Sequence, residues 1–348
     1  MTRYKIIQAD IGQHKCDILS LLRRNLRDET EGAFAWRYEQ TPYGPAEAFV
    51  AVEDASHRIV GIGSVFPRRV YVCGEPVTAW IAGDFSVDSA HRAFGPAMQL
   101  QRHISGHIRA KGLKHFAYGI PNDQSKAIFR RLGYVPVGSF NRFVKILKWE
   151  YRKGKQLLGL RLPVGPADSL LKHLSTETWC RRPRGLSLET PSTFDERFDR
   201  LWNTCCYAYA VVADRSAKAL AWRYLSCPSR AYEIAALTNG RENLVAYVVY
   251  HLEDNMCHVA DLLWDNNEIS PDCLLAEFSL FMRNKGVGSI DIRYLGNPNF
   301  VEHLKRFNFH DHREAAAEVM IFAGRDIPVM QQVLTRDNWH FFAGDTDH

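Results

Sequence analysis

The sequence lacks the features that mark membrane, secreted and metal-bound proteins. None of its apolar runs approaches the about 18 residues that a membrane-spanning helix requires. The segment Met1–Lys5 has no apolar stretch of the kind that directs secretion. The eight cysteines include no Cys-x-x-Cys pair, and we interpret the densest histidine group, His310 to His312, as a surface turn. We therefore expect a cytoplasmic protein with no metal site, in which most cysteines act as small apolar residues.

Disorder and low complexity are equally absent. Charged residues make up 24% of the chain and hydrophobic residues 46%, which excludes long disordered tracts, collagen-like repeats and a disulfide-framed miniprotein. A length of 348 residues favours two domains of ordinary size.

Charge is unevenly distributed, although the net value is only +5. Residues 142–184 hold eleven basic and three acidic side chains, a local balance of +8. One interpretation is a weak contact with a membrane surface or an acidic glycan. The other, which we favour, is a solvated connector that contains one short amphipathic helix. No nucleic-acid-binding motif accompanies the charge, so we expect no nucleic-acid partner.

The chain contains an internal repeat. The segment 35–42, with Ala-Trp-Arg-Tyr followed by Pro42, recurs at 221–228, an offset of 186 residues. The segment 120–134 is echoed by 296–309, where the offset is 175, so we expect about eleven extra residues in a hairpin of the first copy. We interpret the repeated Trp-Arg-Tyr segments as packing at the start of each sheet rather than as substrate-binding aromatics. The predicted units are 1–150, a basic connector 151–184, a second unit 185–325 and a C-terminal tail 326–348.

Residue patterns within the first unit predict an alternation of strands and helices. Strands rich in Val, Ile and aromatics are broken by turn residues, as in an antiparallel meander. Pro96 suits the first turn of a helix and Gly112 its end, while Asn122 can cap a second helix that ends at Gly133. The predicted order is strands 48–53, 59–72 and 77–87, helix 96–111, strand 113–120, helix 123–132 and strands within 134–149.

The loop between the predicted strand 77–87 and the predicted helix 96–111 resembles an anion-binding site. Gly95 lies directly before a helix start, where backbone N–H groups and the positive end of the helix dipole favour a phosphate, and Arg92 adds a positive charge. Ala97 is small enough to admit a ligand, whereas Pro96 has no N–H to donate. Taken alone, a Gly-Pro at a helix start can also be an ordinary turn that begins the helix and binds no ligand.

In context, Arg92-x-x-Gly95-x-Ala97 fits the Gln/Arg-x-x-Gly-x-Gly/Ala loop of the GCN5-related N-acetyltransferase (GNAT) superfamily. The Asn122–Tyr134 segment resembles the same family's Asn…Ala…Leu-Gly-Phe segment. The resemblance covers most of 1–150 and, more faintly, 185–325. It implies a tandem-repeat member of the family with an α/β (α+β) fold. Each of two GNAT-like domains would be a twisted, mostly antiparallel sheet, splayed between its fourth and fifth strands and flanked by helices.

The same resemblance implies that acetyl-CoA is the acyl donor and assigns residues to it. The loop would hold the pyrophosphate, the backbone of the fourth strand would hold the pantetheine arm, and Asn122 would lie near the far end of that arm. The expected cofactor-binding residues are Phe85, Ser86, Val87, Arg92, Ala93, Phe94, Gly95, Ala97 and Asn122.

Direct attack of an amine on a thioester requires a proton acceptor and a proton donor. Asp84 is the candidate base, and strand alternation predicts that it shares a face with Trp80, Ala82 and Ser86, opposite Ile81, Phe85 and Val87. An Asp that caps or solvates a strand end is the alternative. The family's usual donor is a tyrosine, and Phe129 stands in its place. Either Tyr118, Tyr134 or a water would then supply the proton, or the reaction is not ordinary acetyl transfer.

The second unit departs further from the family pattern. Asn267 stands in place of Arg92 and Ser270 in place of Gly95, so we expect a degenerate repeat that helps to form the acceptor site. Asp261 could mark a functional cleft, but we favour a surface residue of a strand.

The predicted function is an acyl-CoA-dependent N-acyltransferase that transfers acetyl to a primary amine of a small molecule or amino sugar. A Fem-like aminoacyltransferase that uses aminoacyl-tRNA, and a non-catalytic CoA-binding or scaffold protein, remain open. The acyl chain length, the acceptor and the oligomeric state stay undetermined.

Overall fold

A computed structural model describes residues 3–112, 114–148, 173, 175–312, 317–323 and 328–346. The first half follows the predicted order, and its elements are β1 (Tyr4–Gln8), α1 (Ile11–Asn25), α2 (Glu31–Tyr38), β2 (Glu47–Glu53), β3 (Ile59–Val72), β4 (Glu75–Val87), the 3-10 helix η1 (Ser89–Phe94), α3 (Pro96–Ala110), β5 (His115–Gly119), α4 (Asp123–Arg131) and β6 (Val135–Ile146).

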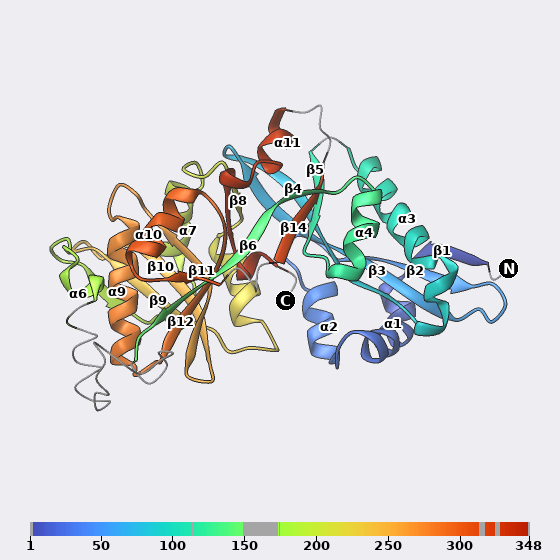
Figure 1. The fold of residues 1–348 in the computed structure, drawn as a ribbon, viewed down its shortest axis with the longest axis horizontal. Coiled ribbons are helices and arrows are strands. Elements are labelled where there is room, and N and C mark those ends of the chain that lie inside the picture. The colour runs from blue at the N-terminus through green and yellow to red at the C-terminus, as the bar shows by residue number, and fades with distance from the viewer. Residues whose placement is uncertain are drawn as a thin grey trace, which may run out of the picture.

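The second half repeats the core of this order, from a meander to two helices that flank a strand. Its elements are α6 (Thr176–Trp179), β7 (Ser187–Glu189), α7 (Glu196–Cys205), β8 (Val211–Ala213), α8 (Ala217–Leu220), η3 (Ala221–Leu225), β9 (Glu233–Thr238), β10 (Leu244–Glu253), β11 (Met256–Trp264), α9 (Pro271–Asn284), β12 (Ser289–Gly296), α10 (Pro298–Arg306), β13 (His310–Asp311), β14 (Ala317–Phe322), α11 (Pro328–Val333), η5 (Arg336–Asn338), β15 (Trp339–Phe342) and η6 (Ala343–Asp345). The two halves lie side by side along the long axis of the molecule (Figure 1).

Local sequence explains several element boundaries. The side chain of Asn122 accepts a hydrogen bond from the backbone N–H of Ser125 at 3.0 Å and so begins α4 as predicted. The two-residue turn between β3 and β4 consists of Cys73 and Gly74, both with positive φ, as a type I′ hairpin requires. The first half therefore contains the expected meander, β2 to β4.

The extra residues of the first half lie in the hairpin, as predicted. The repeat offset is 186 at Trp36 and Trp222 but 177 at Asp84 and Asp261, so nine of the eleven extra residues precede Asp84. They lengthen β3 and β4. The tip of β3 reaches the second half, where residues 70–72 pair with β8.

All strands join one sheet, and its pairings close a ring between the halves. The ring runs β6, β14, β5, β4, β3, β8, β15, β12 and back to β6. Aromatic side chains meet across it, because Tyr118 of β5 packs against Trp339 and Phe341 of β15 at centroid distances of 6.1 and 5.8 Å. This aromatic cluster is part of the largest core around the first half.

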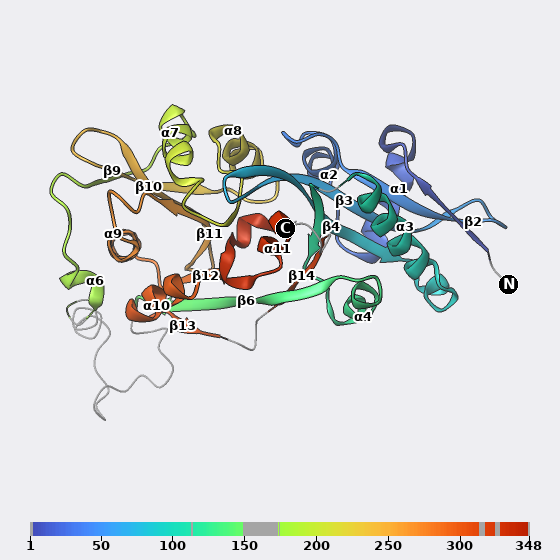
Figure 2. The same cartoon turned by 90° about the horizontal axis from the view of Figure 1, so that it is seen from above.

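The halves also exchange strands. Between β5 and β6 of the first half lies β14, which comes from the second half. Between β12 and β13 of the second half lies the distal part of β6, residues 141–146. Figure 2 shows β6 as one long strand that runs from α4 to α10 across both halves. Neither half therefore completes its sheet without the other.

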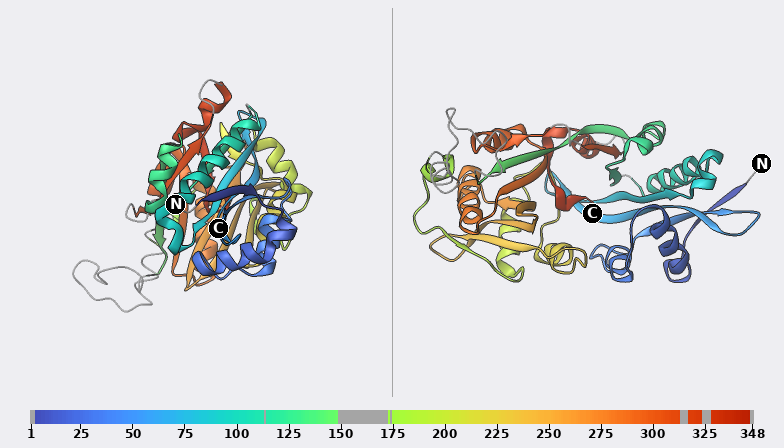
Figure 3. Two further views of the ribbon diagram at one scale, coloured as in Figure 1. Left: turned by 90° about the vertical axis from the view of Figure 1, so that its right-hand side faces the viewer. Right: turned by 60° about the horizontal axis from the view of Figure 1, so that its bottom comes forward.

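The first-half sheet is covered on both faces. Side chains of α1 and α2 pack in one core with Ile81 and Tyr118, and side chains of α3 pack in another with Trp80 and Phe129. Figure 3 shows α1 and α2 on one side of these strands and α3 and α4 on the other.

Some charges of the basic segment are used structurally. Lys145 is 1% exposed and donates to Glu177 at 2.7 Å, and Arg142 pairs with Asp291 at 3.0 Å. Residues 151–172 and 174 of the predicted connector lie outside the described residues. Within the described part of the chain, no helix combines the length and apolarity that a membrane crossing needs.

Candidate active site

The fourth and fifth strands of the first half separate, as predicted. β4 and β5 pair in parallel from Thr78 and His115 to Ile81 and Tyr118, and the pairing ends there. β4 continues to Val87, so its last six residues have no strand partner on the β5 side. On that side the described chain offers this segment no strand to bond, and the carbonyl of Val87 accepts a hydrogen bond from Arg92.

A β-bulge lies at the mouth of this opening. Ser86 pairs with Ile62 and Gly83 with Ser64, so one residue of β3 opposes Asp84 and Phe85. Asp84 adopts φ +48°, in the left-handed region, which a non-glycine residue rarely occupies. The extra residue shifts the alternation of side chains along the strand.

The prediction that Asp84 shares a face of the sheet with Trp80 is therefore wrong. Trp80, Ala82, Phe85 and Val87 pack together on the α3 side, whereas Asp84 contacts α1 and α2 residues on the opposite side. Simple alternation would put Asp84 with Trp80, and the bulge is the physical reason that it does not.

Asp84 is the centre of a buried charge network. Its side chain is fully buried, pairs with Arg27 at 2.5 Å and lies 3.7 Å from Arg37. Tyr38 donates its hydroxyl to the other carboxylate oxygen at 2.7 Å. Glu29 completes the network through ion pairs to both arginines.

This network determines the protonation of Asp84. Burial raises its pKa, but the guanidinium groups of Arg37 and Arg27 and the hydroxyl of Tyr38 outweigh burial, so the pKa lies below its ordinary value. A carboxylate held ionised in this way accepts a proton poorly near neutral pH. It stabilises the bulge and ties β4 to α1 and α2.

The loop after β4 ends in an uncapped helix. Gly95 has φ +87° and is the N-cap of the 15-residue helix α3, and no side chain caps the first turn. Ala97 is half-buried in that turn. Arg92 is exposed and donates to the carbonyl of Val87 at 3.0 Å, which fixes it over the end of β4. The side chains of Ala93 and Phe94 lie outside the described part of the structure.

The other predicted cofactor residues surround the same opening. Phe85, Ser86 and Val87 form the end of β4 beyond its pairing with β5, and Asn122 is exposed at the start of α4. The structure thus brings together the end of β4, the loop and the N-termini of α3 and α4. An anion at the α3 N-terminus and an extended arm along β4 would fit this arrangement.

The candidate proton donors lie on opposite faces of the sheet. Tyr118 donates its hydroxyl to the carbonyl of Asp345 at 2.8 Å, on the α1 and α2 side. The hydroxyl of Tyr134 is buried without a hydrogen-bond partner, between Phe129 and Phe322 on the α3 side. Burial raises the pKa of Tyr134, so it stays protonated at neutral pH.

The corresponding helix start in the second half is closed. Ser270 caps α9 by accepting a hydrogen bond from the N–H of Cys273 at 3.2 Å, and Asp272 adds a negative charge in the first turn. Both features compete with an anion for the helix N-terminus. Asn267, in place of Arg92, supplies no positive charge.

The strand opening of the second half is filled by the chain itself. β11 and β12 pair in parallel only as far as Val259 and Ile292. β15 enters beyond this point and pairs with residues 294–296 of β12. Nε2 of His340 on β15 donates a hydrogen bond to the carbonyl of Leu262 on β11, at 3.1 Å. Gly296 permits the approach, because a Cβ at this position would lie 1.8 Å from the carbonyl oxygen of Trp339.

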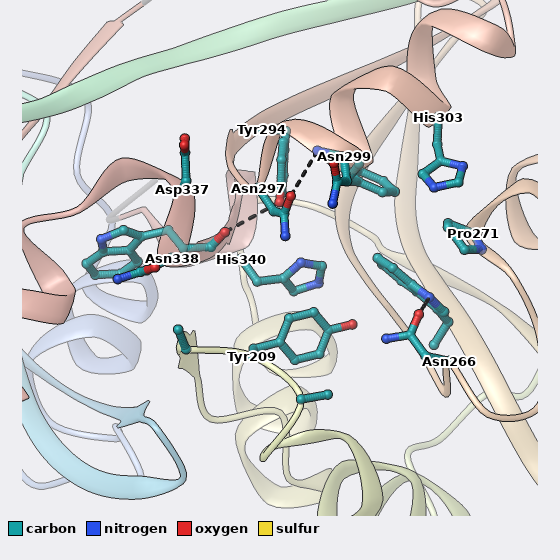
Figure 4. A pocket seen from close by; sticks show the side chains of 15 residues that line it. Tyr209, Asn266, Pro271, Tyr294, Asn297, Asn299, His303, Asp337, Asn338 and His340 are labelled. Atoms are coloured by element: carbon teal, nitrogen blue, oxygen red, sulfur yellow. Dashed lines mark hydrogen bonds between the residues drawn. The ribbon is translucent and has the colours of Figure 1, made fainter.

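A pocket of about 400 Å³ remains beside β15, the strand that plugs the second-half opening (Figure 4). Tyr209 and His340 stack at its centre with ring centroids 4.2 Å apart, and Asn266, Asn297 and Asn299 surround them. Burial lowers the pKa of His340 to about 3, so its ring is neutral.

A larger cavity of about 500 Å³ lies between the halves. Ile120, directly after β5, and Phe140 of β6 line it from the first half. From the second half it is lined by strand residues that include His258 and Asp291, and Thr346 adds the C-terminal segment. The cavity thus borders the end of the opening between β4 and β5.

Asp261 was predicted at the surface, and that prediction is wrong. It is 1% exposed, pairs with Arg215 at 3.0 Å and accepts the hydroxyl proton of Tyr247 at 2.9 Å. Asp345 pairs with the same arginine at 2.7 Å. Burial and the neighbouring Asp345 carboxylate raise the pKa of Asp261 to about 6, against the effect of Arg215.

Comparison with known families identifies this arrangement. Residues 14–137 match the family model described as an acetyltransferase (GNAT) domain, a range that includes β2 to β5, the loop and α4. The matched range lies within the first half, so residues 14–137 are similar to a GNAT domain. Among curated proteins the sequence finds no match.

Solved structures extend the likeness to both halves. A probable N-acyltransferase of unknown function from Enterococcus faecalis V583 has a TM-score of 0.65 at 12% identity, and the match covers 92% of this chain and 72% of that one. A GCN5-related N-acetyltransferase from Kribbella flavida gives 0.61 at 15% identity, with coverages of 92% and 71%. Saccharomyces cerevisiae N-myristoyltransferase with bound myristoyl-CoA gives 0.52 at 12% identity, with coverages of 92% and 79%. At these identities the likeness concerns the fold, which is the predicted α/β fold of GNAT type.

Sequence reasoning missed β15, and it missed a group formed by His251, Glu253 and His258. The sequence contained a signal for the His251, Glu253 and His258 group. His251 and Glu253 are two residues apart on β10, and a two-residue turn separates β10 from β11, which carries His258. Histidine spacing along the chain does not reveal this group, because it forms across two strands.

Proposed function

We propose that the protein is an acyl-CoA-dependent N-acyltransferase, that acetyl-CoA is its donor, and that a primary amine of a small molecule or amino sugar is its acceptor. The supporting observation is the contrast between the halves. In the first, the strand opening is free and leads to an uncapped helix start at Gly95. In the second, β15 fills the opening and Ser270 caps the helix. The two halves would descend from a duplication in which only the first kept the donor site.

In this proposal the loop residues Arg92 to Ala97 bind the pyrophosphate, and the backbone of residues 85–87 binds the pantetheine arm on its β5 side. The 500 Å³ cavity between the halves, at the end of β5, holds the acceptor, and its size suits a small molecule. Asp84 orders the bulge from the other side of β4 rather than taking the amine proton.

Calorimetric titration of acetyl-CoA into the full chain tests the donor site. We expect micromolar binding to the wild type, corresponding to about −8 kcal/mol. Gly95→Glu adds a negative charge at the loop and should abolish binding. Two controls separate charge from strain: Gly95→Ala keeps the unfavourable positive φ, and Gly106→Glu adds the same side chain in open space on the same helix. Both should bind acetyl-CoA.

Release of free CoA thiol with a panel of small amines and amino sugars then tests transfer. Absence of acetyl-CoA binding to the folded wild type would overturn the proposal and favour an aminoacyl-tRNA donor or a scaffold role. Binding without turnover on any amine would favour a non-catalytic CoA-binding protein.

A further inference from the structure

The hairpin formed by β10 and β11 places three potential metal ligands on one face. His251 lies directly opposite His258 in the antiparallel register, and Glu253 follows His251 by two residues on the same face. The connecting turn, Asp254 and Asn255, has positive φ at both positions, as a type I′ turn requires, and this fixes the register.

The three groups are close enough to share one ion. One ligand atom from each residue lies within 4.8 Å of the other two. A tetrahedral zinc ion with bonds of about 2.0–2.2 Å separates its ligand atoms by roughly 3.4 Å, so shifts of about 1 Å would complete the geometry. The imidazole rings are stacked, with centroids 4.9 Å apart and an interplanar angle of 16°. Glu253 is largely exposed and free to rotate toward them.

The groups around His258 and His251 favour metal binding by both imidazoles. Asp291 of β12 lies 3.1 Å from Nδ1 of His258 and is itself fixed by Arg142 at 3.0 Å. A carboxylate on one ring nitrogen leaves the other, Nε2, as the ligand, which is the usual support of a metal-bound histidine. Nδ1 of His251 is buried without a hydrogen-bond partner, and its Nε2 is 3.8 Å from Glu253. A buried polar atom in this state calls for a further partner.

All three side chains line the 500 Å³ cavity between the halves. We propose that His251, Glu253 and His258 bind a divalent transition metal ion of the zinc type, with a fourth coordination position open to this cavity. Two imidazoles and one carboxylate favour zinc or a similar ion over magnesium or calcium, which prefer oxygen ligands alone. Three protein ligands and an open position are typical of sites that bind a further molecule rather than of closed structural sites. The fourth ligand would be an oxygen or nitrogen atom of the molecule in the cavity.

Zinc titration of the full-length protein, after removal of metal by a chelator, tests the site. We expect a single ion per chain by calorimetry, and a visible absorption band of tetrahedral type when cobalt is used instead. His258→Ala and the double variant His251→Ala/His258→Ala should weaken zinc binding at least 100-fold. Glu253→Gln, at an exposed position that does not threaten folding, should weaken it about 10-fold. Asp291→Asn, which removes the carboxylate that supports His258 and also pairs with Arg142, should cost 10–100-fold.

His310→Ala is the matched control, because it removes an exposed histidine of the same half and should leave zinc affinity unchanged. Failure of the wild type to bind one ion per chain would overturn the proposal, as would equal affinity in the double variant and the control. These titrations need no acyl-CoA and no acceptor. Their outcome is thus independent of the donor-site experiment with Gly95→Glu.

Discussion

Trp36 and Trp222 each donate the indole N–H to the backbone carbonyl of the other, at 2.9 and 3.3 Å. Their rings stack with centroids 5.2 Å apart and an interplanar angle of 22°. The two residues occupy equivalent repeat positions, so the contact is reciprocal about a local two-fold relation. The repeated aromatic segments therefore pack against each other between the halves, rather than separately at the start of each sheet.

Replacing one indole should weaken this junction. Trp36→Phe keeps most of the ring but removes one buried N–H donor and leaves the carbonyl of Trp222 without it. We expect a loss of about 1 kcal/mol in the free energy of unfolding, measured by urea denaturation. Trp179→Phe, at a residue that is 78% exposed, is the control and should change stability little. Equal stability of the two variants would contradict a structural role for the reciprocal bonds.

Asp84→Asn separates an orienting role from a catalytic one. The substitution leaves the guanidinium groups of Arg27 and Arg37 beside a neutral amide, so we expect a loss of about 3 kcal/mol in the free energy of unfolding. Acetyl-CoA affinity should stay within threefold, because Phe85, Val87 and the start of α3 lie on the other face of β4. Asp123→Asn, whose side chain is almost fully exposed, serves as control. Unchanged stability with turnover abolished would instead support Asp84 as the base.

Gly296→Ala tests the strand that fills the second-half opening. The added Cβ would meet the carbonyl oxygen of Trp339 at 1.8 Å and its carbonyl carbon at 2.7 Å, and these backbone atoms cannot rotate away as a side chain can. We expect β15 to detach or shift, with a loss of at least about 2 kcal/mol in stability and faster proteolysis of the segment after Asn338. Gly106→Ala adds the same atom in open space and should be neutral or stabilising. A proteolysis rate equal to that control would refute the plug.

The buried carboxylates around Arg215 predict a specific pH dependence. Because the pKa of Asp261 rises from 3.8 to about 6 in the folded state, the folded chain retains a proton there that the unfolded chain has lost. This group therefore lowers stability as pH rises from about 4 to 6. Asp345→Asn removes the neighbouring negative charge, lowers the pKa of Asp261 and should reduce this loss.

Thermal unfolding between pH 4 and 6.5 measures the effect as the slope of Tm against pH, compared with the wild type. The variant also loses an ion pair with Arg215, so its Tm is lower throughout and only the slope is informative. Asp337→Asn, at an exposed acid nearby, should keep the wild-type slope. A slope identical in both variants would show that Asp345 does not act on Asp261.

Local patterns were enough to predict the framework of the first half. The meander, the helix that begins at Pro96 and the cap at Asn122 each depend on residues within a few positions of one another, and each is where it was expected. The extra hairpin length followed from two offsets along the chain. The resemblance of the loop at Arg92 to Ala97 located the domain that the family model matches.

Features that depend on distant segments could not be predicted in this way. The bulge that turns Asp84 toward α2 leaves no clear mark in a strand of alternating residues. The plug depends on Gly296 meeting a strand more than forty residues later, and Asp261 is buried by Arg215 and Asp345, which are distant along the chain. Such contacts are set by the register of the whole sheet.

The exchange of β6 and β14 also constrains how the chain can fold during synthesis. When β5 and β6 have been made, the place between them is still empty, and it stays so until residues 317–322 are available. Until then the first half exposes two unpaired strand edges, which favour association with other chains. The first half can therefore reach its final form only after residues 317–322 have been translated, and its formation should be slow because it depends on such long-range pairing.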